Sequence, residues 1–542
     1  MHVQDMWFEV FFGRSSSVNK ISGQVSAVFR AILDLFFNPA GHDFSRSGVL
    51  LGLPDGTFVQ VFLKLHIVIA DEVALHFMYM CKGSGGLKVC LLCQNVFNAK
   101  EVRGAVDADG SGLAVAHTCH DYGKLVLHTT ATVLAIVRRL ASAKPVMKNG
   151  AFKELQTRLG WKFEGGSLVE STRHLRIADP TEHALYDWMH VFFVQGVFNI
   201  HMGLLATAVQ VFSITYNTLD VYVGQWRWPV LLESKIAKSG GPLSKKRSHS
   251  SWASGVFKAT ASEGLSLVQV LAYFFERVGV AATSTELKAH IDCFQKLCAV
   301  VNLIRSTSRT RVDPASLRAA AEEYLEAFKD LYGTGSMVPK FHCILHFHKF
   351  VERFPVLPNC FVTERKHKQP KRFANEIRNT HGNWETAVAR DVTSRHMSTL
   401  QNRARQGTSE LLDPVYTPSA ALTATLVGAL GEGTFRSSLS ARINEWERVG
   451  KGDVVVLNVN GLHVVGQIAL LADVEEPDGR TTFCQLECFD FVSPAGTHGA
   501  KYRRNGQHRM QFVRDIVCAV VWSGTGSVVT VLYPAHVPTL HV

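Results

Sequence analysis

A change in residue pattern near position 446 divides the chain into two kinds of predicted structure. Beyond it, apolar β-branched residues recur in short segments that are separated by turn residues. The segment DVVVLNVNGLHVVGQIALL contains Asn460-Gly461 between two apolar runs, which is the strongest short signal for a β-hairpin. Three more β-rich runs follow it, TTFCQLECFDFV, FVRDIVCAVVW and SVVTVLYP. The sequence therefore predicts a separate small β-barrel over 446–542, after a connector over 405–445.

The part before the connector is predicted to be rich in helix, above all over about 255–335. The clearest helix covers 313–331, where Asp313 can cap the first turn, Pro314 suits that turn and Gly333 ends the helix. Residues 265–305 have a similar apolar, helical pattern. Ser239–Ser251, which is rich in Gly, Ser and basic residues, is predicted to be an exposed loop.

The N-terminal part begins with predicted strands. Residues 48–75 indicate strand, turn and strand, with the turn at Pro54-Asp55-Gly56. The apolar run Leu63–Ala70 ends directly at Asp71. A carboxylate in this place either presents an acid at the edge of a sheet or caps the helix that follows.

Charge and cysteine content limit the environment and the partners. The 542 residues carry a net charge of +11, and 13 Lys or Arg against 5 Asp or Glu lie between Lys340 and Arg405. Such a basic segment either binds a phosphate backbone or forms a solvated face. Eleven cysteines at irregular spacings and no signal-peptide pattern favour a reducing, intracellular location. Polar residues interrupt the uncharged stretch Val191–Leu219, so a buried helix is expected there, not a membrane span.

Two cysteines offer a metal site. Cys90 and Cys93 form a Cys-x-x-Cys pair, which presents two thiolates to one zinc ion in zinc knuckles; two buried thiols are the alternative. No second Cys-x-x-Cys exists, so other ligands are needed. The candidates are His117, Cys119, His120 and His190.

Two further pairs carry histidines. Asp187 and His190 lie three residues apart, so on one helix face they could share a metal or orient each other; a buried pair at a helix start is the alternative. His342 and His346 have a spacing that can bind zinc, but no Glu follows the first His, so the metalloprotease pattern fails. Periodicity alone favours core or helix-face histidines there.

Taken in order, these motifs resemble the transposase domain of CACTA-type cut-and-paste transposons and of the related KDZ and Plavaka groups. The series is a strand ending in Asp, then K-G-x-x-G-x-K-x-C-x-x-C, D-W-M-H, P-K-F-H-x-x-x-H and F-x-x-E-R-K-H, within about residues 20–400. The resemblance implies an α/β (α+β) fold over 1–404, with an RNase H-like mixed sheet and a large helical insertion. It also implies two-metal Mg²⁺ chemistry on DNA by an Asp-Asp-Glu triad. Asp71 would be the second acid and Glu364 the third, and the residues flanking DNA would be Arg365, Lys366, Lys368, Lys371 and Arg372.

The chain departs from that pattern at the first acid. Only 70 residues precede Asp71, and Ile21–Phe37 aligns with the helix after the strand that should carry the first aspartate. Asp34, Asp43 and Asp55 are substitutes in name only. We therefore expect an N-terminally truncated or decayed relative that binds DNA in the nucleus, not a membrane, and that can form a homo-oligomer. The alternatives are an active Mg-dependent transposase or nuclease, and a chromatin or nucleic-acid scaffold acting through the barrel.

Overall fold

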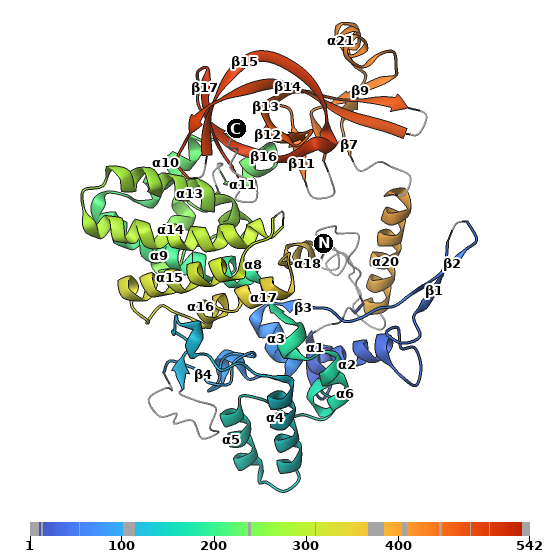
Figure 1. Cartoon of the computed structure of the whole chain (residues 1–542), viewed down its shortest axis with the longest axis vertical. Helices are drawn as coiled ribbons and strands as arrows, with labels where there is room; N and C mark the ends of the chain where they lie inside the picture. Colours follow the sequence, from blue (N-terminus) through green and yellow to red (C-terminus); the bar gives the residue numbers. More distant parts are fainter. Residues whose placement is uncertain are drawn as a thin grey trace.

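The computed structural model is described for residues 10–533. Residues 12, 14, 54, 101–113, 237–239, 309, 367–383, 404–408, 444–446, 477–478 and 498 are left aside. Figure 1 shows the main arrangement, with helices α13–α15 packed side by side, the barrel above them and the N-terminal elements below. The structure is thus mixed helix and strand with a C-terminal barrel, as the sequence predicts.

The N-terminal strands pair only two by two in the part of the chain described before 404. The hairpin β1 (Val49–Gly52) and β2 (Phe58–Val61) is antiparallel, whereas β3 (Val68–Ala70) pairs in parallel with β6 (Ala184–Tyr186). The predicted hairpin is confirmed, with its turn at Asp55 and Gly56. A third pair joins β4 (Val96–Phe97) and β5 (Val115–Ala116). An RNase H-like sheet is therefore not established, although a parallel pair is present.

Short helices surround these strands. Asp71 caps α3 (Glu72–Tyr79), whose first turn follows directly from β3. Thr129 and Thr132 form a capping box at the start of α4 (Thr130–Ala143). The other helices of this part are α1 (Ser15–Val18), α2 (Gln24–Phe37), α5 (Asn149–Leu159), α6 (Thr172–Ile177) and α7 (Pro180–His183).

Three long helices form the predicted insertion. They are α13 (Ala261–Ala281), α14 (Thr285–Ser306) and α15 (Pro314–Tyr332), and each begins at a side-chain cap: Thr260, Ser284 and Asp313. The expected end of α15 at Gly333 is confirmed by its positive φ of 70°. Shorter helices complete this body, namely α8 (Trp188–Phe193), α9 (Val197–Val209), α10 (Tyr216–Gly224), α11 (Val230–Ile236), α16 (Pro339–Ile344), α17 (Phe347–Arg353) and α18 (Phe361–Lys366).

The expected loop at 239–251 is wrong in part, because α12 (Lys245–Ser254) begins inside it. Arg247 makes two hydrogen bonds of 2.8 Å to the carboxylate of Glu263, which belongs to the capping box of α13. This contact with α13 stabilises a helix in a segment whose own composition favours a loop.

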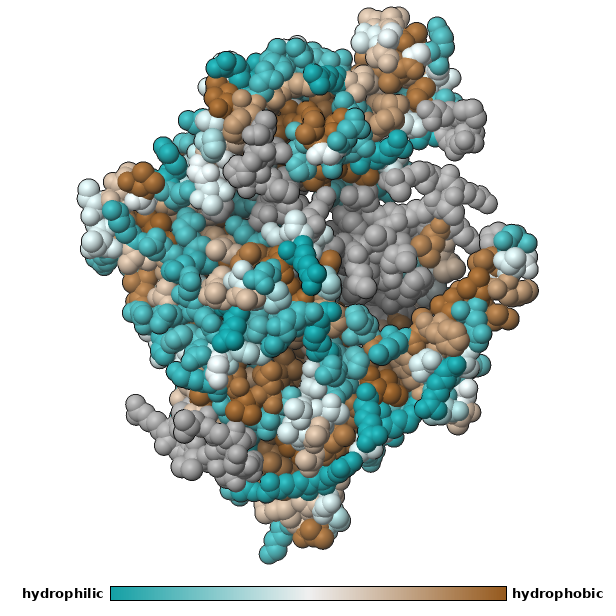
Figure 2. All heavy atoms as spheres, viewed as in Figure 1, coloured by the Kyte–Doolittle hydropathy of each residue, from teal (hydrophilic) through white to brown (hydrophobic). Residues whose placement is uncertain are grey.

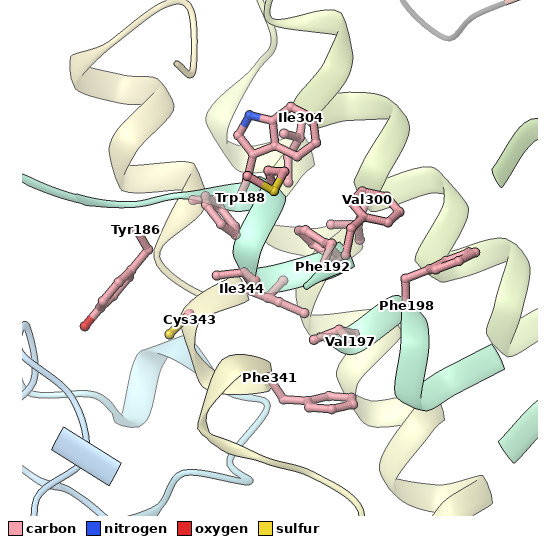
Figure 3. Close-up of a cluster of buried hydrophobic side chains, with 14 of the residues drawn as sticks. Tyr186, Trp188, Phe192, Val197, Phe198, Val300, Ile304, Phe341, Cys343 and Ile344 are labelled. Atoms are coloured by element: carbon pink, nitrogen blue, oxygen red, sulfur yellow. The ribbon is translucent and has the colours of Figure 1, made fainter. Parts of the chain in front are cut away.

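Two helical segments, Trp188–Phe212 and Ala261–Ala281, are long and apolar enough to cross a membrane by length and composition. The most apolar window of the first is 72% buried within the molecule. Figure 3 shows why: its side chains at Trp188, Phe192 and Phe198 lie among those of α14 and α16. This supports the prediction that Val191–Leu219 is a core segment.

The C-terminal part is a closed barrel of six antiparallel strands. Its order is β12-β16-β17-β15-β14-β13, and a pairing between β12 and β13 closes the ring. Asn460 and Gly461 both have positive φ at the predicted β12–β13 turn. The barrel strands are β12 (Val454–Val459), β13 (Leu462–Glu476), β14 (Gly479–Pro494), β15 (Gly499–Phe512), β16 (Ile516–Ser523) and β17 (Val528–Leu532).

Several elements precede the barrel. The polar helix α20 (Trp384–Arg403) follows the helical body, and α21 (Ala420–Leu430) packs against the end of the barrel through Leu426. The small strands are β7 (Glu410–Leu411), β8 (Val415–Tyr416), β9 (Phe435–Ser438), β10 (Ser440–Arg442) and β11 (Arg448–Gly450).

The buried apolar residues divide along the chain. One cluster runs from Leu33 to Cys360 and takes in only Leu532 from the barrel, whereas three smaller clusters consist of residues from Leu411 onward. Contacts still join the two parts: Arg227 exchanges backbone hydrogen bonds of 2.7 and 3.1 Å with Trp522. The side chains of Asp453 and Glu276 add further links, to the backbone of 230 and of 497.

Candidate metal centre and the acidic site beside it

The Cys-x-x-Cys pair lies in a buried cluster with two histidines. Cys90 and Cys93 sit in the loop before β4, while His342 lies on α16 and His346 at the start of α17. All four side chains are buried, and one ligand atom from each lies within 4.8 Å of the others. The cluster could therefore hold a metal ion such as zinc.

The distances between the ligand atoms fit a tetrahedral zinc ion. The Sγ of Cys90 lies 3.4 Å from the Nε2 of His346, and the Sγ of Cys93 lies 3.5 Å from the Nε2 of both histidines. The two Nε2 atoms are 3.1 Å apart. Tetrahedral bonds of about 2.3 Å to sulfur and about 2.0 Å to nitrogen require separations of about 3.5 Å and about 3.3 Å. Four of the six separations among the donor atoms are thus close to those of a tetrahedral zinc site.

Electrostatics at the cluster also suit a cation. Burial alone would raise the pKa of Cys90, but Cys93 and the two histidines hold that pKa well below its ordinary value. Burial and the neighbouring Cys90 raise the pKa of Cys93. The pair therefore favours one thiolate and one thiol, and a dication would stabilise the second thiolate as well.

Neighbouring groups fix the position of Cys90. Its Sγ accepts a hydrogen bond of 3.3 Å from the backbone N–H of Leu92, and it lies 3.5 Å from the hydroxyl of Tyr186. The same hydroxyl accepts from the backbone N–H of Leu91 at 3.2 Å. Figure 3 shows Tyr186, at the end of β6, on the same side of the buried cluster as Cys343 of α16. The contact of Tyr186 with Cys90, and His342 on α16, bring both elements to the metal centre.

The other candidate zinc ligands are used elsewhere. His117 contacts the backbone O of Met337 at 2.8 Å, and His120 lies 3.8 Å from Glu326. Cys119 donates to the backbone O of Asp121. His190, the last of the four candidates, lies in a separate group with Asp187 and Cys360 and not with the two cysteines. The prediction that His342 and His346 are ordinary core or helix-face histidines is also incomplete. Both side chains are buried, but they lie against the thiols of Cys90 and Cys93.

The acidic site lies where β3 and β6 end. Because the two strands are parallel neighbours, Asp71 and Asp187 follow them at the same edge, and the backbone N–H of Asp187 donates to the O of Ala70 at 3.0 Å. Glu364, on α18, brings its Oε1 to 3.8 Å from the Nε2 of His190. The structure thus brings three of the predicted acids and bases, Asp71, Glu364 and His190, to one region.

Asp187 is the buried anchor of this site. Its Oδ1 accepts from the backbone N–H of Met189 at 3.3 Å and of Cys360 at 3.0 Å, and its Oδ2 accepts from the backbone N–H of His190 at 3.2 Å. The Nδ1 of His190 also bonds to Oδ2. Both oxygens are therefore occupied, so Asp187 caps α8 and orients His190, which were two of the alternatives open from sequence.

Charge at the site favours a protonated His190. Burial would lower its pKa, but the hydrogen bond with Asp187 and the nearby charges of Asp71 and Glu364 raise that pKa above the ordinary value. Asp71 itself accepts from the backbone N–H of Ala74 at 2.6 Å, so one of its oxygens is used as a helix cap.

The possible replacements for the first acid are engaged elsewhere. Asp34 bonds to Arg173 and His174, Asp43 to the side chain of Ser45, and Asp55 to Thr57 at the hairpin tip. Lys368, Lys371 and Arg372 lie outside the described residues, as do the side chains of Arg365 and Lys366. Carboxylates and other oxygens are what Mg²⁺ needs, and the donor group found here contains one carboxylate, one histidine and one cysteine. The described residues thus give no support for Mg²⁺.

No protein-family model matches the chain, and the curated proteins contain no significant match to it. The functional argument therefore rests on the geometry.

Proposed function

We propose that this chain is a transposase-derived DNA-binding protein in which a zinc ion holds the core and strand cleavage has been lost. The observation that carries the proposal is the meeting of Asp71, His190 and Glu364 at the ends of two parallel strands. Glu364 lies about 290 residues beyond Asp71 in the sequence. A titratable group with a shifted pKa, such as His190, beside further acids at one edge is typical of a functional site.

The basic segment supplies the contact with DNA in this proposal. Eight of the eleven net positive charges lie between Lys340 and Arg405, which begins at the acidic site and continues through α20. In α20, Val388 and Val392 are buried, while Arg390 and Arg395 are exposed. A helix with this pattern packs on one side and presents its basic residues on the other, where Arg395 pairs with Asp391 at 3.4 Å. Exposed cations of this kind attract phosphates. A nuclear location would follow from this partner.

We propose that strand cleavage is lost because the carboxylates of the site already make other hydrogen bonds and ion pairs. Asp187 is saturated with hydrogen bonds and Asp71 caps α3. Glu364 faces His190, whose pKa is lowered by burial but raised overall above its ordinary value by Asp187, Asp71 and Glu364.

Binding is tested by fluorescence anisotropy with a labelled DNA duplex at several salt concentrations. We expect the logarithm of the binding constant to fall with the logarithm of salt concentration with a slope of roughly −4 or steeper, as about five phosphate contacts would give. Replacing four cations by Gln should make the slope shallower by about 3. The test variant changes Lys366, Lys368, Lys371 and Arg372. A control variant with equal charge loss changes Lys144, Lys148, Lys153 and Lys162.

A flat salt response in the native protein would reject DNA binding, and an equal loss of affinity in both variants would reject the assigned segment.

Cleavage is tested separately by nicking of supercoiled DNA with Mg²⁺ or Mn²⁺. The proposal expects equal background rates for the native protein and Glu364→Gln. Metal-dependent nicking that Glu364→Gln abolishes would establish the active enzyme instead.

A further inference from the structure

Charge is divided unequally between the two halves of the barrel. Over 454–494, which contains β12, β13 and β14, one Arg is present against six Asp or Glu. Over 499–532, which contains β15, β16 and β17, five Lys or Arg are present against one Asp. The first half therefore has a net charge of −5 and the second half a net charge of +4, although the barrel as a whole is close to neutral.

Strand β15 carries most of the positive charge. Its cations are Lys501, Arg503, Arg504 and Arg509, and no Asp or Glu lies in β15, β16 or β17. Figure 1 shows β15 on the side of the barrel that points away from the helical body, and Figure 2 shows hydrophilic residues gathered along that side. Arg504 is used within the barrel, since it pairs with Glu487 at 2.9 Å. Lys501 and Arg503 are exposed, so they can meet a partner.

Lys501 and Arg503 lie side by side on the outer face of the barrel. Tyr502, between them, is buried in the barrel core, so the alternation of side chains along a strand turns both cations outward. In the antiparallel register, Lys501 lies opposite Thr530 of β17 and Arg503 lies opposite Val528. Residues i and i+2 of a strand are about 7 Å apart and neighbouring strands about 4.8 Å apart, so these four residues form one compact surface.

The N–H groups of both cations are free for a ligand. Within the described part of the chain, neither Lys501 nor Arg503 makes an ion pair. The nearest carboxylate by register, that of Asp490 on β14, lies opposite Arg503 but accepts from the side-chain amide of Asn505 at 2.8 Å. Two neighbouring cations repel each other, and an anion bound between them offsets that repulsion. The surface therefore suits an anion with several charges, such as a phosphate backbone.

We propose that the outer face of β15 and β17 is a second DNA-binding surface, at which Lys501, Arg503 and the hydroxyl of Thr530 contact phosphates. The inference takes its partner from the proposed function, but it uses residues outside Lys340–Arg405. Lys, Arg and Thr side chains donate to phosphate oxygens, and such contacts hold a duplex without reading its sequence. An acidic protein suits the surface less, because the cores of protein interfaces are rich in aromatic side chains and poor in charge. The two rows described above hold one exposed apolar residue, Val528.

Fluorescence anisotropy of the full chain with two labelled duplexes of unrelated sequence, over a salt series, tests this surface. Lys501→Gln/Arg503→Gln should make the slope of log binding constant against log salt shallower by about 2 on both duplexes. It should also weaken binding about tenfold or more at about 0.1 M salt. Lys153→Gln/Arg158→Gln is the matched control, since it removes one exposed Lys and one exposed Arg from α5, at the opposite end of the molecule (Figure 1). Both variants should unfold at the native Tm, because all four side chains are exposed.

The conservative variant Lys501→Arg/Arg503→Lys keeps both charges and should bind like the native protein. The inference is overturned if the Gln variant keeps the native slope, if the α5 control loses as much affinity, or if the conservative variant loses affinity too. The variant of four cations in the basic segment separates the two proposals. If it binds normally while the barrel variant does not, the basic segment is rejected and the barrel surface stands. A native chain that binds no DNA rejects both.

Discussion

Removing the metal from the Cys90/Cys93/His342/His346 cluster should destabilise the helical body, and Cys93→Ser is the sharpest way to remove it. Four printed separations among the donor atoms are already close to tetrahedral values, so a zinc ion would need little rearrangement to bind. A bound ion would also join two segments about 250 residues apart, the loop that carries Cys90 and Cys93 and the helices that carry His342 and His346. Its loss therefore acts on the body as a whole.

The magnitude follows from linkage between binding and folding. Free zinc at about 1,000 times its dissociation constant stabilises a folded site by about 4 kcal/mol. For a body of about 350 residues with an unfolding entropy of about 2 cal/mol/K per residue, this corresponds to about 5 °C in Tm. The serine variant should lose one zinc per chain and show this decrease.

The assay combines metal analysis with thermal unfolding, and Cys298→Ser is the control. Cys298 is equally buried, on α14, but it lies outside the cluster. The control should keep its zinc, and a chelator should lower the Tm of the native protein and of the control but not that of Cys93→Ser. The reasoning is refuted if the native protein contains no zinc, or if the chelator shifts all three proteins equally.

Three other expectations concern sites remote from the metal. His190→Asn should cost more stability at pH 6 than at pH 9, because the pKa of His190 is raised in the folded state and the stabilisation is lost as pH rises through that pKa. Thermal unfolding at both pH values checks this, and an equal loss of stability at the two would contradict it. Gly203→Ala should lower the free energy of unfolding by about 1–3 kcal/mol, because a Cβ there would lie 2.3 Å from a backbone oxygen. Gly150→Ala has open space around its Cβ and should be neutral or stabilising, and denaturant titrations of both variants check this. Asp473→Asn should destabilise the barrel by about 3 kcal/mol, because this buried carboxylate pairs with two arginines. The control Glu475→Gln removes an exposed ion pair and should change stability by less than about 1 kcal/mol.

Local signals in the sequence were sufficient for elements that local chemistry determines. Asn460-Gly461 and the Asp313-Pro314 start of α15 act through backbone geometry within a few residues, and both predictions are confirmed. The helix α12 was missed because its support is the distant Glu263.

The metal ligands show the same limit. Cys90 and Cys93 could be recognised from their spacing, but His342 is about 250 residues away and only the fold brings it to them. The P-K-F-H-x-x-x-H motif was the available signal, since its two histidines already had a spacing suited to one zinc ion. The sequence did not show that the two cysteines and the two histidines lie together, because no local pattern contains that information.

The metal centre and the acidic site are joined through α16. His342 on this helix faces the two cysteines, while Lys340, two residues earlier, donates through Nζ to the backbone O of His190 at 3.1 Å and of Val194 at 2.6 Å. These are carbonyls at the end of α8, whose first turn is capped by Asp187. A zinc ion bound to His342 would hold α16 in place and, through Lys340, would also hold the helix that carries His190.

This connection makes a final prediction for hydrogen exchange. In Cys93→Ser, the backbone amides of α8 should exchange faster than in Cys298→Ser, because Lys340 no longer holds the end of α8 in place. The barrel strands should exchange alike in both variants, since most of their core residues belong to separate clusters. Equal protection of α8 in the two variants would mean that the acidic site is built independently of the metal, and that β3, β6 and the saturated Asp187 are enough to hold it.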